Sequence, residues 1–254
     1  MKVLVLVKRV PAPGAKINIT ADEQAVDTKN LGFAMSPHEE CGIELAVQLV
    51  EAHGGTSTVM TLGAQESEEQ LRYAVSLGVD HAILVPTDVD DWDPMATASA
   101  LASAIADAEA GEPFDLIIFG NESADSGGYQ VGIRAAHALD RPIVSGIKSI
   151  DIDGDTVKAR RQTVAGLEEY RLTMPAIVAV KEGITLPRYP TMKGRLNARK
   201  AEVVASPQPH TPGGQKRVRL IPAPEQVSNT VVLGEGPEAA GKIVDLLVEL
   251  GVLS

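Results

Sequence analysis

Residues 116–132 read LIIFGNESADSGGYQVG, and the order of residue types in this stretch decides the fold. The first four residues are a compact apolar run, which is typical of a strand covered on both faces of a parallel sheet. Glycines and small polar residues follow, and then a helical pattern over residues 129–139. Glycine allows close approach of a ligand to the backbone, and free amides at a helix start attract phosphate. The stretch therefore predicts a strand, a ligand loop at its carboxyl end and a helix.

The same alternation continues on both sides of this stretch. Further compact apolar runs predict buried strands, and they lie at residues 3–7, 57–62, 82–85 and 143–145. Helices between them begin at caps: Ser36-Pro37-His38-Glu39 and Ser67-Glu68-Glu69-Gln70 predict capping boxes, and Asp93-Pro94 opens a helix to about Ala108. This order of elements predicts an α/β fold with a doubly wound, mostly parallel, Rossmann-like sheet.

The pattern changes after residue 147, where antiparallel strands are expected. Residues 148–152 and 156–161 flank Asp153-Gly154, a strong hairpin signal, and residues 169–173 predict one more antiparallel strand. Residues 177–180 return to the buried type of strand.

We expect two parts in the chain. Residues 1–205 form the α/β domain, which includes the hairpin and a cationic loop at about 185–200. Residues 206–254 form a linker and a carboxy-terminal arm, because residues 206–215 have loop composition. The last predicted helix, residues 237–250, cannot bury its apolar face on a small core of its own, so we expect the arm to pack on another chain.

Composition excludes several classes of protein. A net charge of −11 and an aromatic content of 3% argue against a nucleic-acid partner. The single cysteine, Cys41, excludes an intramolecular disulfide framework and a CxxC metal site. The first apolar run ends at Lys8-Arg9, too early for a signal peptide or a membrane span, so we expect a cytoplasmic protein without membrane insertion.

Residues for catalysis or metal binding are not apparent. The five histidines lack ligand spacing, and no GxSxG or Cys/His arrangement supports hydrolysis. Asp88, Asp90, Asp91 and Asp93 are interpreted as a solvated loop with a helix cap rather than as a cation site. These patterns favour a carrier or a scaffold over an enzyme.

Two segments keep alternative interpretations open. The loop after Phe119 is neither a Walker A motif nor a GxGxxG motif, so it binds a nucleotide or only connects strand to helix. The segment LPRYPTMKGRLNARK, residues 186–200, carries five positive charges and no negative one. It is a solvated basic loop, a basic RNA-binding patch or a docking site.

Several stretches, taken together, resemble one family. They are VLVLVKRVPAP near the start, the helix entry Met35-Ser36-Pro37, the loop at 120–132, GLEEYRLTMPAIV at 166–178, and Pro187-Arg188-Tyr189. The resemblance is to the beta subunit of electron transfer flavoproteins, including nitrogen-fixation-associated homologues, and it covers nearly the whole chain.

The resemblance implies a heterodimer with an alpha subunit that holds most contacts to a redox-active FAD. Such a pair accepts electrons from flavoprotein dehydrogenases, such as the acyl-CoA dehydrogenases of fatty acid oxidation, and passes them towards the respiratory chain. The beta subunit of the family is an electron carrier subunit without catalytic residues of its own.

The family also buries AMP as a structural ligand in this subunit. Carried over to this chain, the AMP site comprises Leu6, Ser36, Pro37, His38, Glu39, Leu62, Gly120, Asn121, Ser123, Ala124, Asp125, Ser126, Gly127, Gly128, Tyr129, Gln130 and Val131. The form Gln130-Val131-Gly132 also resembles bifurcating members with a second FAD, which stays as an alternative. A free-standing ATP- or AMP-binding protein of the universal-stress type is another, although such a domain ends near residue 147.

The cationic segment corresponds to the loop that the family uses to recognise dehydrogenases. Met192 occupies the position usually held by a leucine anchor, and a flexible methionine suits a site that accepts several partners. By the same resemblance, partner docking involves Arg188, Tyr189, Met192, Lys193 and Arg195.

Overall fold

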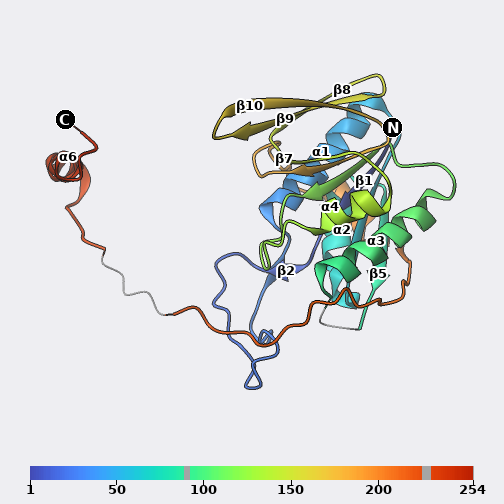
Figure 1. Cartoon of the computed structure of the whole chain (residues 1–254), viewed down its shortest axis with the longest axis horizontal. Helices are drawn as coiled ribbons and strands as arrows, with labels where there is room; N and C mark the ends of the chain where they lie inside the picture. Colours follow the sequence, from blue (N-terminus) through green and yellow to red (C-terminus); the bar gives the residue numbers. More distant parts are fainter. Residues whose placement is uncertain (89–91, 225–229, 254) are drawn as a thin grey trace. The chain divides into compact units, whose positions relative to one another are not determined.

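The computed structural model describes residues 1–88, 92–224 and 230–253 (Figure 1). It divides into two compact units, Met1–Leu220 and Ile221–Ser254. The first unit holds the sheets and all but the last helix, and the second holds the carboxy-terminal helix.

A seven-stranded sheet forms the centre of the first unit, and every neighbouring pair in it is parallel. In spatial order the strands are β12 (Val203–Ala205), β5 (His81–Pro86), β4 (Thr56–Gly63), β1 (Lys2–Leu6), β6 (Leu116–Gly120), β11 (Ala176–Val180) and β7 (Ile143–Ile147). The predicted α/β fold with a doubly wound parallel sheet is confirmed.

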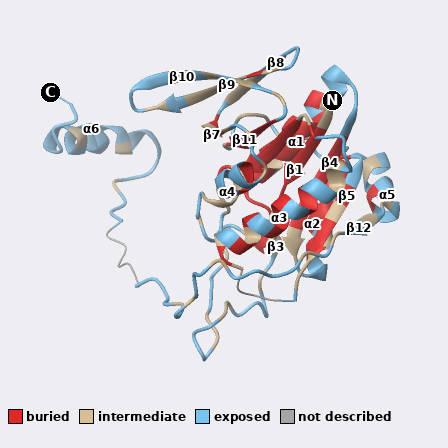
Figure 2. Cartoon of the chain, turned by 45° about the vertical axis from the view of Figure 1, so that its right-hand side comes forward, coloured by how far each residue is buried: buried red, intermediate tan, exposed pale blue. Residues whose placement is uncertain are grey.

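Helices cover both faces of this sheet (Figure 2). The helices are α1 (Pro37–His53), α2 (Glu68–Leu77), α3 (Pro94–Glu109) and α4 (Val131–Ala138). Successive residues of β1 point to opposite faces: Val3 and Val5 pack with α1 and α2, whereas Leu4 and Leu6 pack with α3 and α4. Both faces of the strand are therefore buried, which explains its uninterrupted apolar sequence.

Two of the predicted helix caps are confirmed and one is wrong. Ser36 and Glu39 form the expected capping box of α1, and Asp93 accepts hydrogen bonds from two backbone amides of α3. Ser67 instead ends a short 3₁₀ helix, Gln65–Ser67, with helical backbone angles and no side-chain cap within the described residues. The 3₁₀ turn continues directly into α2, so Ser67 does not have the extended backbone that a capping residue needs. Of the acidic cluster, Asp90 and Asp91 lie outside the described residues.

A separate antiparallel sheet contains β8 (Ser149–Asp153), β9 (Thr156–Thr163) and β10 (Gly166–Thr173), in the order β10-β9-β8. Gly154 makes the predicted turn with a φ of 61°. One face of the sheet joins the core, and on β9 Arg160 pairs with Asp151 and Glu169 of the neighbouring strands. After this sheet the chain returns to the central sheet as β11, between β6 and β7. The sequence pattern did not predict that position.

The cationic segment is not a loop throughout. Its second half is a helix, α5 (Met192–Lys200), which Thr191 caps with a bond from the Gly194 amide to its hydroxyl at 3.0 Å. The prediction of a loop over 185–200 is wrong for these residues, because tertiary contacts described below hold a helix that the pattern does not show.

The remaining segments have little regular structure. A two-stranded ribbon joins β2 (Val10–Pro11) to β3 (Phe33–Ala34). Residues 206–220 contact the rest of the first unit at both ends, where Ser206 donates to the Leu84 carbonyl and Leu220 donates to the Glu23 carbonyl, each at 2.8 Å.

The second unit contains a 3₁₀ turn, Gly236–Glu238, and α6 (Ala239–Glu249). No residue of α6 is buried, as far as the chain is described. Among the described residues, no helix has both the length and the apolar character needed to cross a membrane.

Candidate functional site

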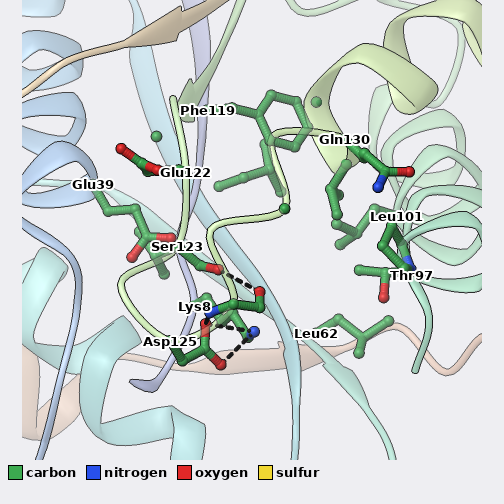
Figure 3. Close-up of a pocket in the computed structure, with 18 of the residues that line it drawn as sticks. Lys8, Glu39, Leu62, Thr97, Leu101, Phe119, Glu122, Ser123, Asp125 and Gln130 are labelled. Carbon is green, nitrogen blue, oxygen red and sulfur yellow. Dashed lines mark hydrogen bonds and ion pairs between the residues drawn. The ribbon is translucent and has the colours of Figure 1, made fainter. Parts of the chain in front are cut away.

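A cavity of about 550 Å³ opens at the carboxyl ends of the central strands (Figure 3). Its floor includes Leu6 from β1, Leu62 from β4 and Phe119 from β6. The connections from β1 and β6 run in opposite directions along the sheet, so the cavity lies at the switch point of the strand order. This is where doubly wound sheets bind ligands.

Most residues expected at a nucleotide site line this cavity. They are Leu6, Glu39, Leu62, Gly120, Asn121, Ser123, Asp125, Ser126, Gly128, Tyr129, Gln130 and Val131. The others lie in the same segments but not on the cavity wall: Ser36, Pro37 and His38 at the start of α1, and Ala124 and Gly127 in the loop after β6. Their contact with a ligand stays a prediction.

The loop at 121–130 is tied to the end of β1 by an ion pair. Lys8 Nζ lies 2.6 Å from Asp125 Oδ2 and 2.9 Å from its Oδ1. Burial acts to raise the pKa of Asp125, but the charge and the hydrogen bond of Lys8, together with hydrogen bonds from Ser123 and Ser126, outweigh it and hold this pKa below its usual value. Asp125 is therefore ionised and paired at neutral pH.

The start of α1 is tied to the same loop. His38 Nδ1 accepts a hydrogen bond from the Glu182 amide at 2.6 Å, so the proton of a neutral ring lies on Nε2, which is 3.3 Å from Glu122 Oε1. Ser36 Oγ donates to the carbonyl oxygen of Glu122 at 3.3 Å. These contacts join α1, the loop after β6 and the residues after β11.

Glu39 is a buried carboxyl group on the cavity wall. Its Oε2 accepts from the Ser36 amide at 3.0 Å, and a Cβ at Gly120 would lie only 2.8 Å from its Cγ. Burial raises the pKa of Glu39 to about 8, against the opposing hydrogen bonds of Ser36 and Lys8. Burial thus favours the uncharged form of this carboxyl, which lowers the repulsion of an anionic ligand.

The start of α4 differs from the prediction. Tyr129 has a φ of 56°, a left-handed conformation that a helix cannot include, so α4 begins at Val131. Gln130, at the N-cap, accepts from Arg134 at 3.1 and 3.0 Å and does not cap the helix. Within the described residues, no cap side chain therefore satisfies the first amides of α4, and Val131, Gly132 and Ile133 line the cavity. Such amides suit a phosphate group.

The sequence interpretation missed the cationic part of the wall. Lys8, Arg9 and Arg217 line the cavity, and the Arg9 guanidinium stacks on Phe33 with 3.5 Å between its central carbon and the ring centroid. Lys8 and Arg9 directly follow a predicted central strand, so their place at its carboxyl end was available as a signal. Arg217 comes from a segment of loop composition, and no pattern in the sequence connects it with the cavity.

The residues predicted for partner docking lie on other elements. Tyr189 and Met192 are 91% and 75% exposed, and Lys193 and Arg195 are exposed on α5. Two further apolar side chains, Leu186 and Leu196, are exposed in the same segment. Arg188 differs, because it pairs within the protein with Glu44 and Glu51 of α1. We call the exposed residues Leu186, Tyr189, Met192 and Leu196 the apolar patch.

Comparison with known proteins places these features in a family context. Residues 25–210 match the family model described as "Electron transfer flavoprotein domain". A Bacillus subtilis (strain 168) protein named "Electron transfer flavoprotein subunit beta" is 32% identical over 257 residues, which cover 97% of each chain. Proteins of the same name from Mycobacterium tuberculosis (strain ATCC 25618 / H37Rv) and Dictyostelium discoideum are 31% and 29% identical, over 79% and 80% of this chain and 77% and 80% of theirs.

Proposed function

The chain belongs to the family of electron transfer flavoprotein beta subunits, and we propose that it is the non-catalytic subunit of a flavin-dependent electron carrier. It pairs with an alpha subunit that makes most of the contacts to one FAD. When bound, this FAD supplies the electron-accepting chemistry. The pair is cytoplasmic. It accepts electrons from flavoprotein dehydrogenases, such as acyl-CoA dehydrogenases, and passes them towards the respiratory chain. The match over 97% of the chain to a relative of that name carries the proposal.

The universal-stress alternative fits the structure less well. A domain that ends near residue 147 would lack β11, which lies inside the central sheet between β6 and β7. Part of the chain after residue 147 therefore belongs to the main core.

We propose AMP as the ligand of the cavity, with its phosphate at the start of α4. Residues 131–133 line the cavity at the start of α4, and within the part of the chain that is described no side chain caps this helix end, which supports this orientation. The apolar strand ends at Leu6, Leu62 and Phe119 suit the adenine ring. The protein's own residues bind and orient the nucleotide, and the uncharged Glu39 lowers the electrostatic cost of the phosphate.

A second FAD is the alternative ligand. Arg9 and Arg217 add positive charge to the cavity wall, which suits a pyrophosphate. This arrangement adds to the Gln130-Val131-Gly132 form of the loop, which resembles bifurcating members.

The test is co-expression with an alpha subunit, followed by denaturation of the purified heterodimer and mass spectrometry of the released nucleotides. We expect one AMP and one FAD for each heterodimer. Two FAD and no AMP would select the bifurcating alternative. Release of no nucleotide from the beta subunit would refute the cavity assignment, and purification of a stable colourless monomer that does not bind an alpha subunit would refute the carrier function.

The same proposal assigns two surfaces to partners. The apolar patch docks flavoprotein dehydrogenases, with Met192 as the anchor. The carboxy-terminal arm packs on the alpha subunit, because Ile243, Val244 and Val248 of α6 are exposed.

A further inference from the structure

Helix α5 is too short and too polar to be stable by itself. It has nine residues, MKGRLNARK, which include a glycine, an asparagine and four basic side chains. Isolated helices shorter than about 12 residues are marginal in water even in alanine-rich sequences. Contacts with the rest of the first unit must therefore hold this helix.

One anchor lies at the carboxyl end of α5. Arg72 of α2 donates from Nη1 to the carbonyl oxygens of Ala198 and Ala201, at 3.0 and 2.9 Å. The last carbonyls of a helix have no partner within the helix, so these bonds close its end. Glu68, one turn earlier on α2, holds the guanidinium from the other side at 3.0 Å.

The inner face of α5 packs closely on α2. Gly194 and Ala198, one helical turn apart, form this face: Ala198 is buried, and a Cβ at Gly194 would lie 2.1 Å from the Ser76 carbonyl oxygen. Only glycine permits this approach. The small residues therefore fix the depth at which α5 sits against α2.

A second anchor lies just before α5. Arg188 binds both carboxyl oxygens of Glu44 at 2.8 and 3.0 Å and both of Glu51 at 2.7 and 2.9 Å. Its backbone amide also donates to Glu44, and Gln48 donates to the same carboxylate. Glu44 is almost completely buried, so its charge depends on Arg188 for compensation. The chain is thereby attached to α1 three residues before the cap of α5.

The outer face of α5 is left with Met192 and Leu196, four residues apart and both exposed. We propose that Arg72 and Arg188 are positioning residues: they keep α5 folded in the free protein, so that Met192 and Leu196 form a preformed stripe for a flavoprotein dehydrogenase. The partner surface that fits is an apolar pocket bordered by carboxylates, since α5 carries four basic residues and no acidic one. This inference rests on the proposed docking function of the segment.

Arg72 and Arg188 affect the affinity for the dehydrogenase without contacting it, because they keep α5 folded before docking. If a variant leaves α5 folded in only about a tenth of the molecules, the apparent affinity falls about tenfold, because only the folded fraction binds. The rate at saturating partner concentration stays unchanged, because the bound state is the same.

The experiment uses the heterodimer with Arg72→Ala, which removes the bonds to the Ala198 and Ala201 carbonyls and the ion pair with the partly buried Glu68. Arg171→Ala, on the outer sheet, is the matched control, since Arg171 is exposed and pairs with Glu169 at 3.3 Å. We expect KM for the dehydrogenase to rise about tenfold in Arg72→Ala with kcat unchanged. Hydrogen exchange of the amides at 195–200 should accelerate, while flavin and nucleotide content stay as in the wild type. Arg188→Lys keeps a positive charge beside Glu44 but loses the paired hydrogen bonds of the guanidinium. We expect it to give a smaller rise in KM and a smaller acceleration of hydrogen exchange.

A double variant separates this inference from the proposed function. In a Met192→Ala, Leu196→Ala background, Arg72→Ala should no longer raise KM, because the stripe is already absent. Unchanged exchange of the α5 amides in Arg72→Ala, or faster exchange with unchanged KM, would overturn the positioning role. If Met192→Ala with Leu196→Ala itself leaves KM at the wild-type value, the docking function fails, whatever the arginines do.

Discussion

The cavity at the edge of the sheet and the surface of α5 use charge in opposite ways. Around the cavity, Lys8 pairs with Asp125, His38 contacts Glu122, and burial favours the uncharged form of Glu39. On α5 the basic side chains point to solvent, and the ion pairs lie behind the helix, at Arg72 and Arg188. The cavity proposed to bind a ligand is thus built from strand ends and charge-compensated groups, whereas the surface proposed for docking depends on ion pairs that lie outside it.

Among the variants that test this comparison, Arg188→Ala should have the largest effect, a fall in the free energy of unfolding. The substitution leaves the buried charge of Glu44 without its partner, and breaking such a pair costs about 3–5 kcal/mol. We expect the urea midpoint of the first unit to fall accordingly. The Arg171→Ala control should change the free energy of unfolding by less than about 0.5 kcal/mol. Equal midpoints for the two variants would contradict the view that the α5 surface depends on buried ion pairs.

A pH titration tests the cavity side of the contrast. The folded pKa of Glu39, about 8, lies above its usual value of 4.5, so the folded state keeps a proton that the unfolded state releases. The resulting stability is fully present below pH 4.5 and is lost as pH rises through 8, with a slope of up to about 1.4 kcal/mol per pH unit. Glu39→Gln should remove this slope between pH 5 and 8, measured by urea unfolding. A variant with the same pH profile as the wild type would show that Glu39 is charged in the folded protein.

A smaller effect, confined to binding, is expected for Met192→Ala. A well-buried methionine contributes roughly 1.5–3 kcal/mol, so docking should weaken about ten- to hundredfold. Stability and the flavin spectrum should stay unchanged, because Met192 is exposed in the free protein. Stopped-flow reduction by a dehydrogenase at subsaturating concentration provides the measurement. If the variant reacts at the wild-type rate, Met192 is not an anchor for the dehydrogenase, and the α5 surface does not act in docking through this side chain.

The buried strands and most helices were predictable because their signals are local. β1, β4, β5, β6 and β7 each appear as one short apolar run, and Ser36 and Asp93 cap helices through residues only two or three positions away. The boundary of α4 and the supposed cap at Ser67 were wrong, since the left-handed Tyr129 and the 3₁₀ turn before α2 are set by the path of the chain rather than by residue type.

The candidate site was predictable in part. The loop at 121–130 could be placed at the carboxyl edge of the sheet, because a strand that passes into a helix in this fold has its loop there. The contribution of Arg217 could not be predicted, because this residue reaches the cavity from a segment of loop composition that follows the last strand of the sheet. The ligand itself stays a proposal.

The sequence by itself determined the α/β class, the positions of all but the shortest strands, the caps of α1 and α3, and the resemblance that the family match confirms. Only the tertiary structure decided that β11 enters between β6 and β7, that α5 is a helix, and that Arg188 pairs with Glu44 across 144 positions of sequence. The physical reason is that burial patterns and caps depend on neighbours along the chain. The ionisation of Glu39, the partner of Arg188 and the stability of a nine-residue helix depend instead on groups brought together only when the chain has folded.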